Sequence, residues 1–158
     1  MKKLIIFLFI FNFTNLYSSD LKFEKIFDNL DKPWSLSFID KNNVIITEKT
    51  GKLLTLNLKN KNTKEIQHNL SLISLGQGGL LDVLFNNNYV YVSYSENRGS
   101  WETSTSVAKG RFDKNKINFN NIFQAEPPID SGYHFGSRLV IKDNHLYITA
   151  GERGQGMI

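Results

Sequence analysis

Two polar side chains could do chemistry because each directly precedes an apolar, strand-like run in a glycine-rich setting. Gln77 lies in GQGGLLD, residues 76–82, and His134 lies in SGYHFGSRL, residues 131–139. A neutral imidazole can accept a proton from a substrate hydroxyl near neutral pH, and a primary amide can hydrogen-bond a polar ligand. From the residues alone, a second interpretation stays open for each: a His that bonds locally, and a solvated Gln at a bulged strand entry.

Several other kinds of chemistry are disfavoured by what the sequence lacks. The patterns HExxH, GxSxG and GxxxxGK are absent, which argues against a zinc protease, an α/β-hydrolase and a P-loop NTPase. The chain has no Cys, so it has no disulfide and no thiolate ligand for a metal. Its Lys residues are scattered among Asn, as in residues 59–64, which indicates solvated turns and not a nucleic-acid-binding patch.

The elements that must position Gln77 and His134 are predicted to be β-strands, because apolar and polar residues alternate over short runs. Residues 33–51, 78–99 and 135–154 repeat one plan: a strand, a turn rich in Asn or Asp, a second strand, and then a Glu followed by a Gly. Repeats of about 40–50 residues with four strands each are typical of β-propeller blades.

We therefore expect an all-β fold, a β-propeller. Blade one is predicted at 34–66, blade two at 79–124, and the first two strands of blade three from 135 onward, giving about two and a half four-stranded blades, of the six that the family resemblance described below implies. Residues 23–28 are predicted to form an additional strand. Since propellers close with about 4–8 blades, we expect the chain to be the N-terminal part of a longer protein. A small β-sandwich is the alternative.

The first residues have the layout of a secretory signal peptide. Lys2 and Lys3 precede an apolar run at 4–13, and Ser18 and Ser19 supply small residues for cleavage. The run is shorter than the roughly 20 residues of a spanning helix, so no stable membrane insertion is expected. We predict a signal peptide at 1–19, a propeller domain at 20–158, and a periplasmic or secreted bacterial protein. The net charge of +4 falls to +2 with the two lysines removed.

Five segments in this order resemble the soluble aldose sugar dehydrogenases, the glucose/sorbosone dehydrogenase family. They are LDKPWSLSF (30–38), GQGGLLDV (76–83), YVSYSE (91–96), YHFGSRLV (133–140) and GERGQ (151–155). The resemblance implies a propeller that uses pyrroloquinoline quinone (PQQ) and calcium. It also implies oxidation of an aldose sugar at its anomeric carbon to a lactone, by hydride transfer to the quinone.

Site roles follow from the same resemblance. His134 matches the general base, and Gln77 matches a Gln that contacts substrate and cofactor. Tyr133 stands where the glucose-specific branch has an acidic residue, which favours an enzyme with a broader range of aldose substrates. The same match makes Tyr133 a residue that contacts substrate or cofactor. The family's calcium ligands and the cations that bind the quinone carboxylates lie in later blades. We therefore expect no metal ligands here, and neither tight quinone binding nor activity from this chain alone. The electron acceptor is not identified.

Two other functions remain as alternatives. A calcium-dependent lactonase-type propeller would need channel-facing acidic ligands on several blades. Glu48, Glu96 and Glu152 recur at spacings of 48 and 56 residues, but we interpret them as turn or inter-blade contacts because each ends the second strand of its repeat. A non-catalytic propeller that binds a partner or an envelope glycan is the other alternative.

Overall fold

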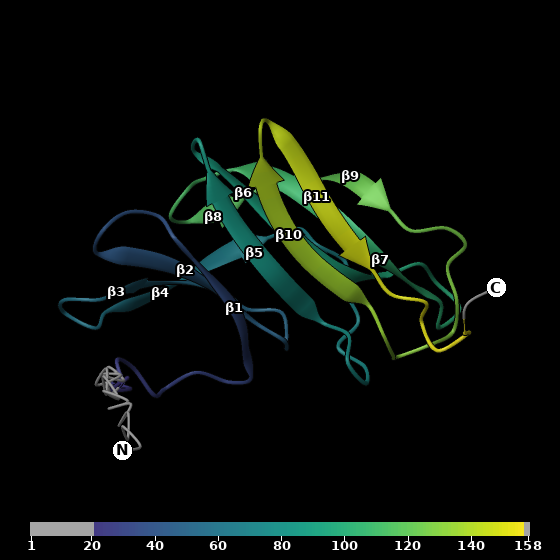
Figure 1. Cartoon of the computed structure of the whole chain (residues 1–158), viewed down its shortest axis with the longest axis horizontal. Helices are drawn as coiled ribbons and strands as arrows, with labels where there is room; N and C mark the ends of the chain where they lie inside the picture. Colours follow the sequence, from purple (N-terminus) through teal and green to yellow (C-terminus); the bar gives the residue numbers. More distant parts are fainter. Residues whose placement is uncertain (1–20, 157–158) are drawn as a thin grey trace, which may run out of the picture.

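The chain is all-β over the part that the structure describes. The computed structural model describes residues 21–156, so the predicted signal peptide at 1–19 lies outside the described residues. Strands in this span form three sheets arranged side by side, as Figure 1 shows. Between residues 21 and 156 no helix is long and apolar enough to cross a membrane. The arrangement confirms the predicted partial propeller and differs from the single β-sandwich considered as an alternative.

The first sheet corresponds to the predicted blade one and has the strand order β1-β2-β3-β4-β8. Its strands are β1 (Pro33–Phe38), β2 (Asn43–Glu48), β3 (Leu53–Asn57), β4 (Thr63–His68) and β8 (Lys116–Ile117). The first four follow one another as antiparallel hairpins, whereas β8 comes from much later in the chain and runs parallel to β4. The sequence did not predict β8, because two residues carry no periodic signal.

The second and third sheets correspond to blade two and to the start of blade three. Their strands are β5 (Leu80–Asn86), β6 (Tyr89–Asn97), β7 (Thr103–Arg111) and β9 (Asn120–Gln124), then β10 (Gly136–Lys142) and β11 (His145–Ala150). Two-residue turns join β5 to β6 and β10 to β11. The turn residues have positive φ, from 49° to 63°, at Asn87, Asn88, Asp143 and Asn144. Asn and Asp tolerate this left-handed geometry, which explains why the chain reverses there.

Neighbouring blades are joined by hydroxyl groups at one recurring position. Thr47 on β2 donates through Oγ1 to the carbonyl of Leu81 on β5, at 2.5 Å. Ser93 on β6 donates through Oγ to the carbonyl of Ser137 on β10, at 2.6 Å. The strand registers place Thr47 and Ser93 at equivalent points of their blades. Each blade therefore fixes the first strand of the next blade by a buried hydrogen bond.

One buried carboxylate, that of Asp82, connects the inner strands of all three blades. Asp82 on β5 is only 4% exposed. It accepts hydrogen bonds from the hydroxyl of Ser35 on β1, at 2.5 Å, and from the backbone N–H of Leu139 on β10, at 2.7 Å. Charge-assisted bonds of this kind are stronger than neutral ones. Asp82 thus sets β1, β5 and β10 relative to one another, and with them the loops at their ends.

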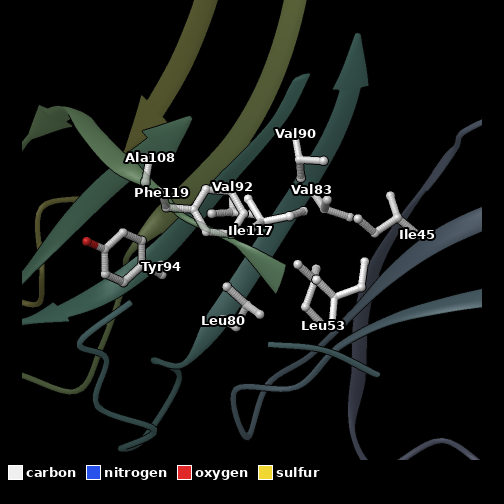
Figure 2. Packing of buried hydrophobic residues seen from close by; sticks show 11 residues of the cluster. Ile45, Leu53, Leu80, Val83, Val90, Val92, Tyr94, Ala108, Ile117 and Phe119 are labelled. Carbon is white, nitrogen blue, oxygen red and sulfur yellow. The ribbon is translucent and has the colours of Figure 1, made fainter. Parts of the chain in front are cut away.

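The main apolar core lies between blades one and two. Figure 2 shows Ile45 and Leu53 of blade one close to Leu80 and Val83 of blade two. The cluster consists of Ile45, Leu53, Ile66, Leu80, Val83, Val90, Val92, Tyr94, Ala108, Ile117 and Phe119. Burying apolar side chains of this size contributes roughly 1.5–3 kcal/mol each, so this cluster is the main source of stability for the two blades.

The strand predicted at residues 23–28 is wrong. Residues 21–30 have no regular secondary structure, and in the described part of the chain no strand pairs with them. A strand needs a neighbouring ladder for its backbone groups. Two apolar residues of this segment, Phe27 and Leu30, instead pack against a second apolar cluster of blade one, formed by Val44, Ile46, Leu54 and Leu56.

Candidate active site

Three loops meet at one end of the inner strands. Residues 69–79 lead into β5, residues 125–135 lead into β10, and residues 151–156 follow β11. Figure 1 shows the starts of β5 and β10 and the end of β11 at the same lower edge of the molecule. Loops held at the end of a rigid sheet are common places for binding and catalysis. Both motifs singled out in the sequence lie here.

The structure brings Gln77 and His134 into direct contact. The backbone N–H of Gln77 donates to the carbonyl of Gly132 at 2.7 Å, and the side-chain Oε1 of Gln77 accepts the backbone N–H of His134 at 2.8 Å. Gly76 permits this approach, since a Cβ there would lie 2.5 Å from the same Gly132 carbonyl oxygen. Gln77 thus uses its side-chain carbonyl to hold the backbone of His134.

The backbone of His134 is strained. Its φ is 48°, a left-handed value that non-glycine residues rarely adopt. Such a conformation persists only where the surroundings impose it, and it is concentrated at functional sites. Close backbone packing contributes here, because Gly151 lies directly against the carbonyl group of His134.

Glu152 holds the imidazole ring of His134. Nδ1 of His134 is hydrogen-bonded to Oε1 of Glu152, and this bond is the main reason why the pKa of Glu152 lies below its usual value. The carboxylate is therefore ionised at neutral pH. A carboxylate at Nδ1 fixes the tautomer in which Nδ1 carries the proton and Nε2 keeps its lone pair. The two side chains are 52% and 38% exposed, so the pair is open to a ligand.

Glu152 makes the turn contact that the sequence suggested, because it accepts the backbone N–H of Gly154 at 3.3 Å, but its contact with His134 was missed by the sequence analysis. A usable signal was present. His134 lies just before β10 and Glu152 lies just after β11, and these two strands form one antiparallel hairpin. The residues flanking the open end of a hairpin face each other. The predicted strand pair therefore already placed a carboxylate opposite the candidate base.

Tyr133 lies beside His134 at the open end of the site. Its side chain is 59% exposed, and its ring meets the imidazole edge-on with centroids 6.4 Å apart. An exposed aromatic face next to a polar group is suited to contact with a sugar ring or a planar cofactor. The position agrees with a residue that lines the binding surface.

The other two recurring glutamates belong to separate networks. Glu48 accepts the backbone N–H of Asp31 at 2.7 Å, and Glu96 accepts side-chain bonds from Ser106, Asn121 and Gln124 within blade two. Among residues 21–156, no three His, Asp or Glu side chains gather in a way that could hold a metal ion. The convergent carboxylates that a lactonase-type site needs do not occur in this part of the chain.

Comparison with known proteins agrees with this geometry. The family model described as Glucose / Sorbosone dehydrogenase matches residues 30–157. The chain belongs to the glucose/sorbosone dehydrogenase family. The aldose sugar dehydrogenase of Escherichia coli (strain K12) is 32% identical over 142 residues, which cover 84% of this chain and 38% of that protein. This chain thus spans well under half the length of that member of the family.

Solved structures show the same relation. A glucose dehydrogenase crystal structure superposes with a TM-score of 0.78 at 30% identity, covering 84% of this chain and 41% of that one. The crystal structure of the soluble aldose sugar dehydrogenase of Escherichia coli in its apo-form superposes with a TM-score of 0.76 at 33% identity, covering 84% of this chain and 41% of that one. The structure of the PQQ-bound aldose sugar dehydrogenase of Streptomyces coelicolor superposes with a TM-score of 0.72 at 17% identity. It covers 83% of this chain and 41% of that one, which supports the fold.

Proposed function

We propose that the full-length protein containing this chain oxidises aldose sugars at the anomeric carbon to lactones, with His134 as the general base. The observation that carries this proposal is the hydrogen bond between Nδ1 of His134 and Glu152 at the open end of the inner strands. Family membership and the named activity of the Escherichia coli relative support the substrate class. The signal-peptide pattern adds export to the periplasm or medium to the proposal.

The chain's own residues would handle the proton. Nε2 of His134 takes the proton of the anomeric hydroxyl, and the charge of Glu152 stabilises the imidazolium that forms. The hydrogen on the same carbon leaves as a hydride, and the oxygen forms the lactone carbonyl. PQQ, when bound, is the two-electron acceptor. Exposed Tyr133 beside the base, in place of an acidic residue, favours a range of aldoses over glucose alone.

The described residues fit the sugar side of this site better than the cofactor side. PQQ carries several carboxylates and needs cations to hold them. Two cations lie next to the site, and both are already bonded to backbone carbonyls: Lys49 to Gly76, and Arg153 to Tyr133. We propose that residues beyond this chain hold PQQ and calcium. Titration calorimetry of residues 20–158, with folding checked by circular dichroism, should show no tight binding. Stoichiometric, calcium-dependent binding would contradict this.

The activity is tested with full-length protein reconstituted with PQQ and calcium, by dye reduction with a panel of aldoses. We expect sugar-dependent reduction, and we expect His134→Gln to lower kcat by about 10²–10⁴-fold, the usual contribution of a general base. His145→Gln, at the exposed first residue of β11, is the matched control and should keep full activity. Failure of the holoprotein to reduce dye with any aldose would reject the proposal, as would full activity of His134→Gln.

A further inference from the structure

Arg153 is a buried cation directly beneath the loop that carries His134. It follows Glu152 in the sequence and is only 7% exposed, although it lies in a glycine-rich turn where an arginine would ordinarily reach into solvent. None of the chemistry above uses it.

Its guanidinium group donates hydrogen bonds to the loop before His134 and lies over the ring of Phe135, the residue after it. Nε donates to the carbonyl of Tyr133 at 2.9 Å, and Nη2 donates to the carbonyl of Ser131. The guanidinium also lies over the ring of Phe135, 3.7 Å from its centroid. Ser131 in turn donates its hydroxyl to the carbonyl of Arg153 at 2.6 Å. Residues 131, 133 and 135 are therefore all held by one side chain.

The same group is anchored to blade two. Nη1 of Arg153 donates to the carbonyl of Thr103 at 3.0 Å, and Nη2 donates to the Thr103 hydroxyl at 2.6 Å. Thr103 begins β7 and is 2% exposed, so the anchor is part of a packed sheet. The planar fork of an arginine can reach several acceptors at fixed angles, which an ammonium group cannot do. The loop is thus tied to a rigid strand through Arg153.

All the acceptors around this charge are neutral. The oxygens come from three backbone carbonyls and one hydroxyl, and burial lowers the pKa of Arg153 from its usual value. A buried cation without a carboxylate partner is costly, and an apolar side chain of similar size commonly serves stability better. The cost falls at the loop that carries His134, which points to a role beyond general stability.

We propose that Arg153 is a positioning residue that imposes the left-handed backbone of His134 and so sets the direction of its Nε2. Glu152 holds the imidazole ring, while Arg153 holds the backbone before His134 and the ring of Phe135 after it. The kinetic part of this inference rests on the proposed function of His134 as base. The structural part does not depend on that function.

The test compares Arg153→Met and Arg153→Lys in the full-length protein. Met keeps an unbranched side chain over Phe135 but has no donors, and Lys keeps the charge without the fork. Arg98→Met is the matched control, because Arg98 donates to Ser104 and Glu126 but not to residues 131–135. Four quantities are measured: amide hydrogen exchange of residues 131–136, kcat and KM on an aldose, and the melting temperature.

We expect Arg153→Met to speed exchange in residues 131–136 about tenfold or more, a local opening that leaves the inner strands protected. We expect kcat to fall about 10- to 100-fold with KM changed less than about threefold, since a base displaced by about 1 Å loses rate without losing substrate affinity. Arg153→Lys should be intermediate, and Arg98→Met should match the wild type in exchange and kcat. If Arg153→Met does not fold, Arg153→Lys takes its place, because Lys lacks the planar fork and should show the same local effect at smaller size.

Unchanged exchange in residues 131–136 of folded Arg153→Met, or of Arg153→Lys where the former does not fold, would overturn the inference. So would a uniform rise in exchange across all strands, because that is the signature of a purely global stability effect. A wild-type protein without sugar oxidation would reject the proposed function, and the exchange comparison would still decide whether Arg153 positions the loop.

Discussion

Replacing Gly151 by Ala tests whether the backbone of His134 must stay where it is. A Cβ on residue 151 would lie 2.7 Å from the carbonyl carbon of His134 and closer still to its oxygen. Carbon atoms in contact are normally about 3.5–4.0 Å apart, so either the loop or the end of β11 must move by about 1 Å. A misplacement of that size commonly costs about 100-fold in rate. Overpacking adds a stability loss of about 1–3 kcal/mol.

The assay is steady-state aldose oxidation by reconstituted full-length protein, with the melting temperature measured in parallel. Gly99→Ala is the control. Gly99 has a φ of 85° and nothing within 4 Å of an added Cβ, so the variant should lose about 1 kcal/mol through backbone strain and keep its kcat. A folded Gly151→Ala protein with kcat within about twofold of wild type would refute the reasoning, because the shift of His134 would then have no catalytic consequence.

Two further predictions concern stability. Asp82→Ala leaves the Ser35 hydroxyl and the Leu139 N–H unpaired, so urea denaturation should show a loss of about 2–4 kcal/mol, and a loss below about 0.5 kcal/mol would contradict the inter-blade role. Burial is the main cause that raises the pKa of Tyr94 to about 12 from 10.0. The unfolded chain therefore loses this phenol proton first, and the stability present below pH 10 should fall between pH 10 and 12. Melting temperatures across that range should fall less steeply for Tyr94→Phe than for wild type, while Tyr147→Phe, at an exposed tyrosine, should behave like wild type.

The blades could be predicted because their hairpins carry local signals. Asn87–Asn88 and Asp143–Asn144 mark tight turns between alternating runs, and this information lies within a few residues. The recurring glutamates were a poorer guide. Counted from the hairpin turns, the ladders align Thr47 with Ser93, so Glu48 aligns with Tyr94 and not with Glu96, and both ladders also contain register shifts near the starts of β1 and β5. Bulges of this kind depend on packing between strands and leave no clear trace in the sequence.

Part of the site could also be predicted from local signals in the sequence. Gln77 and His134 were found because each precedes an inner strand, and Glu152 could have been found from the hairpin that places it opposite His134. The burial of Arg153 could not be predicted from the sequence. An arginine in a glycine-rich turn is expected to be exposed, and its anchor Thr103 lies 50 residues away in sequence. That contact depends on how two blades pack, which no local pattern describes.

The short strand β8 has a consequence for how the molecule comes apart. It pairs Lys116 with Gln67 and Ile117 with His68, so chain that follows β7 of blade two completes the outer edge of blade one. Ile117 is fully buried in the cluster that contains Ile45 of blade one. Blade one therefore cannot open without breaking the β8 ladder and exposing that core. Arrays whose repeats touch only at their faces can unravel one repeat at a time. Here the first two blades should melt together, in a single cooperative transition.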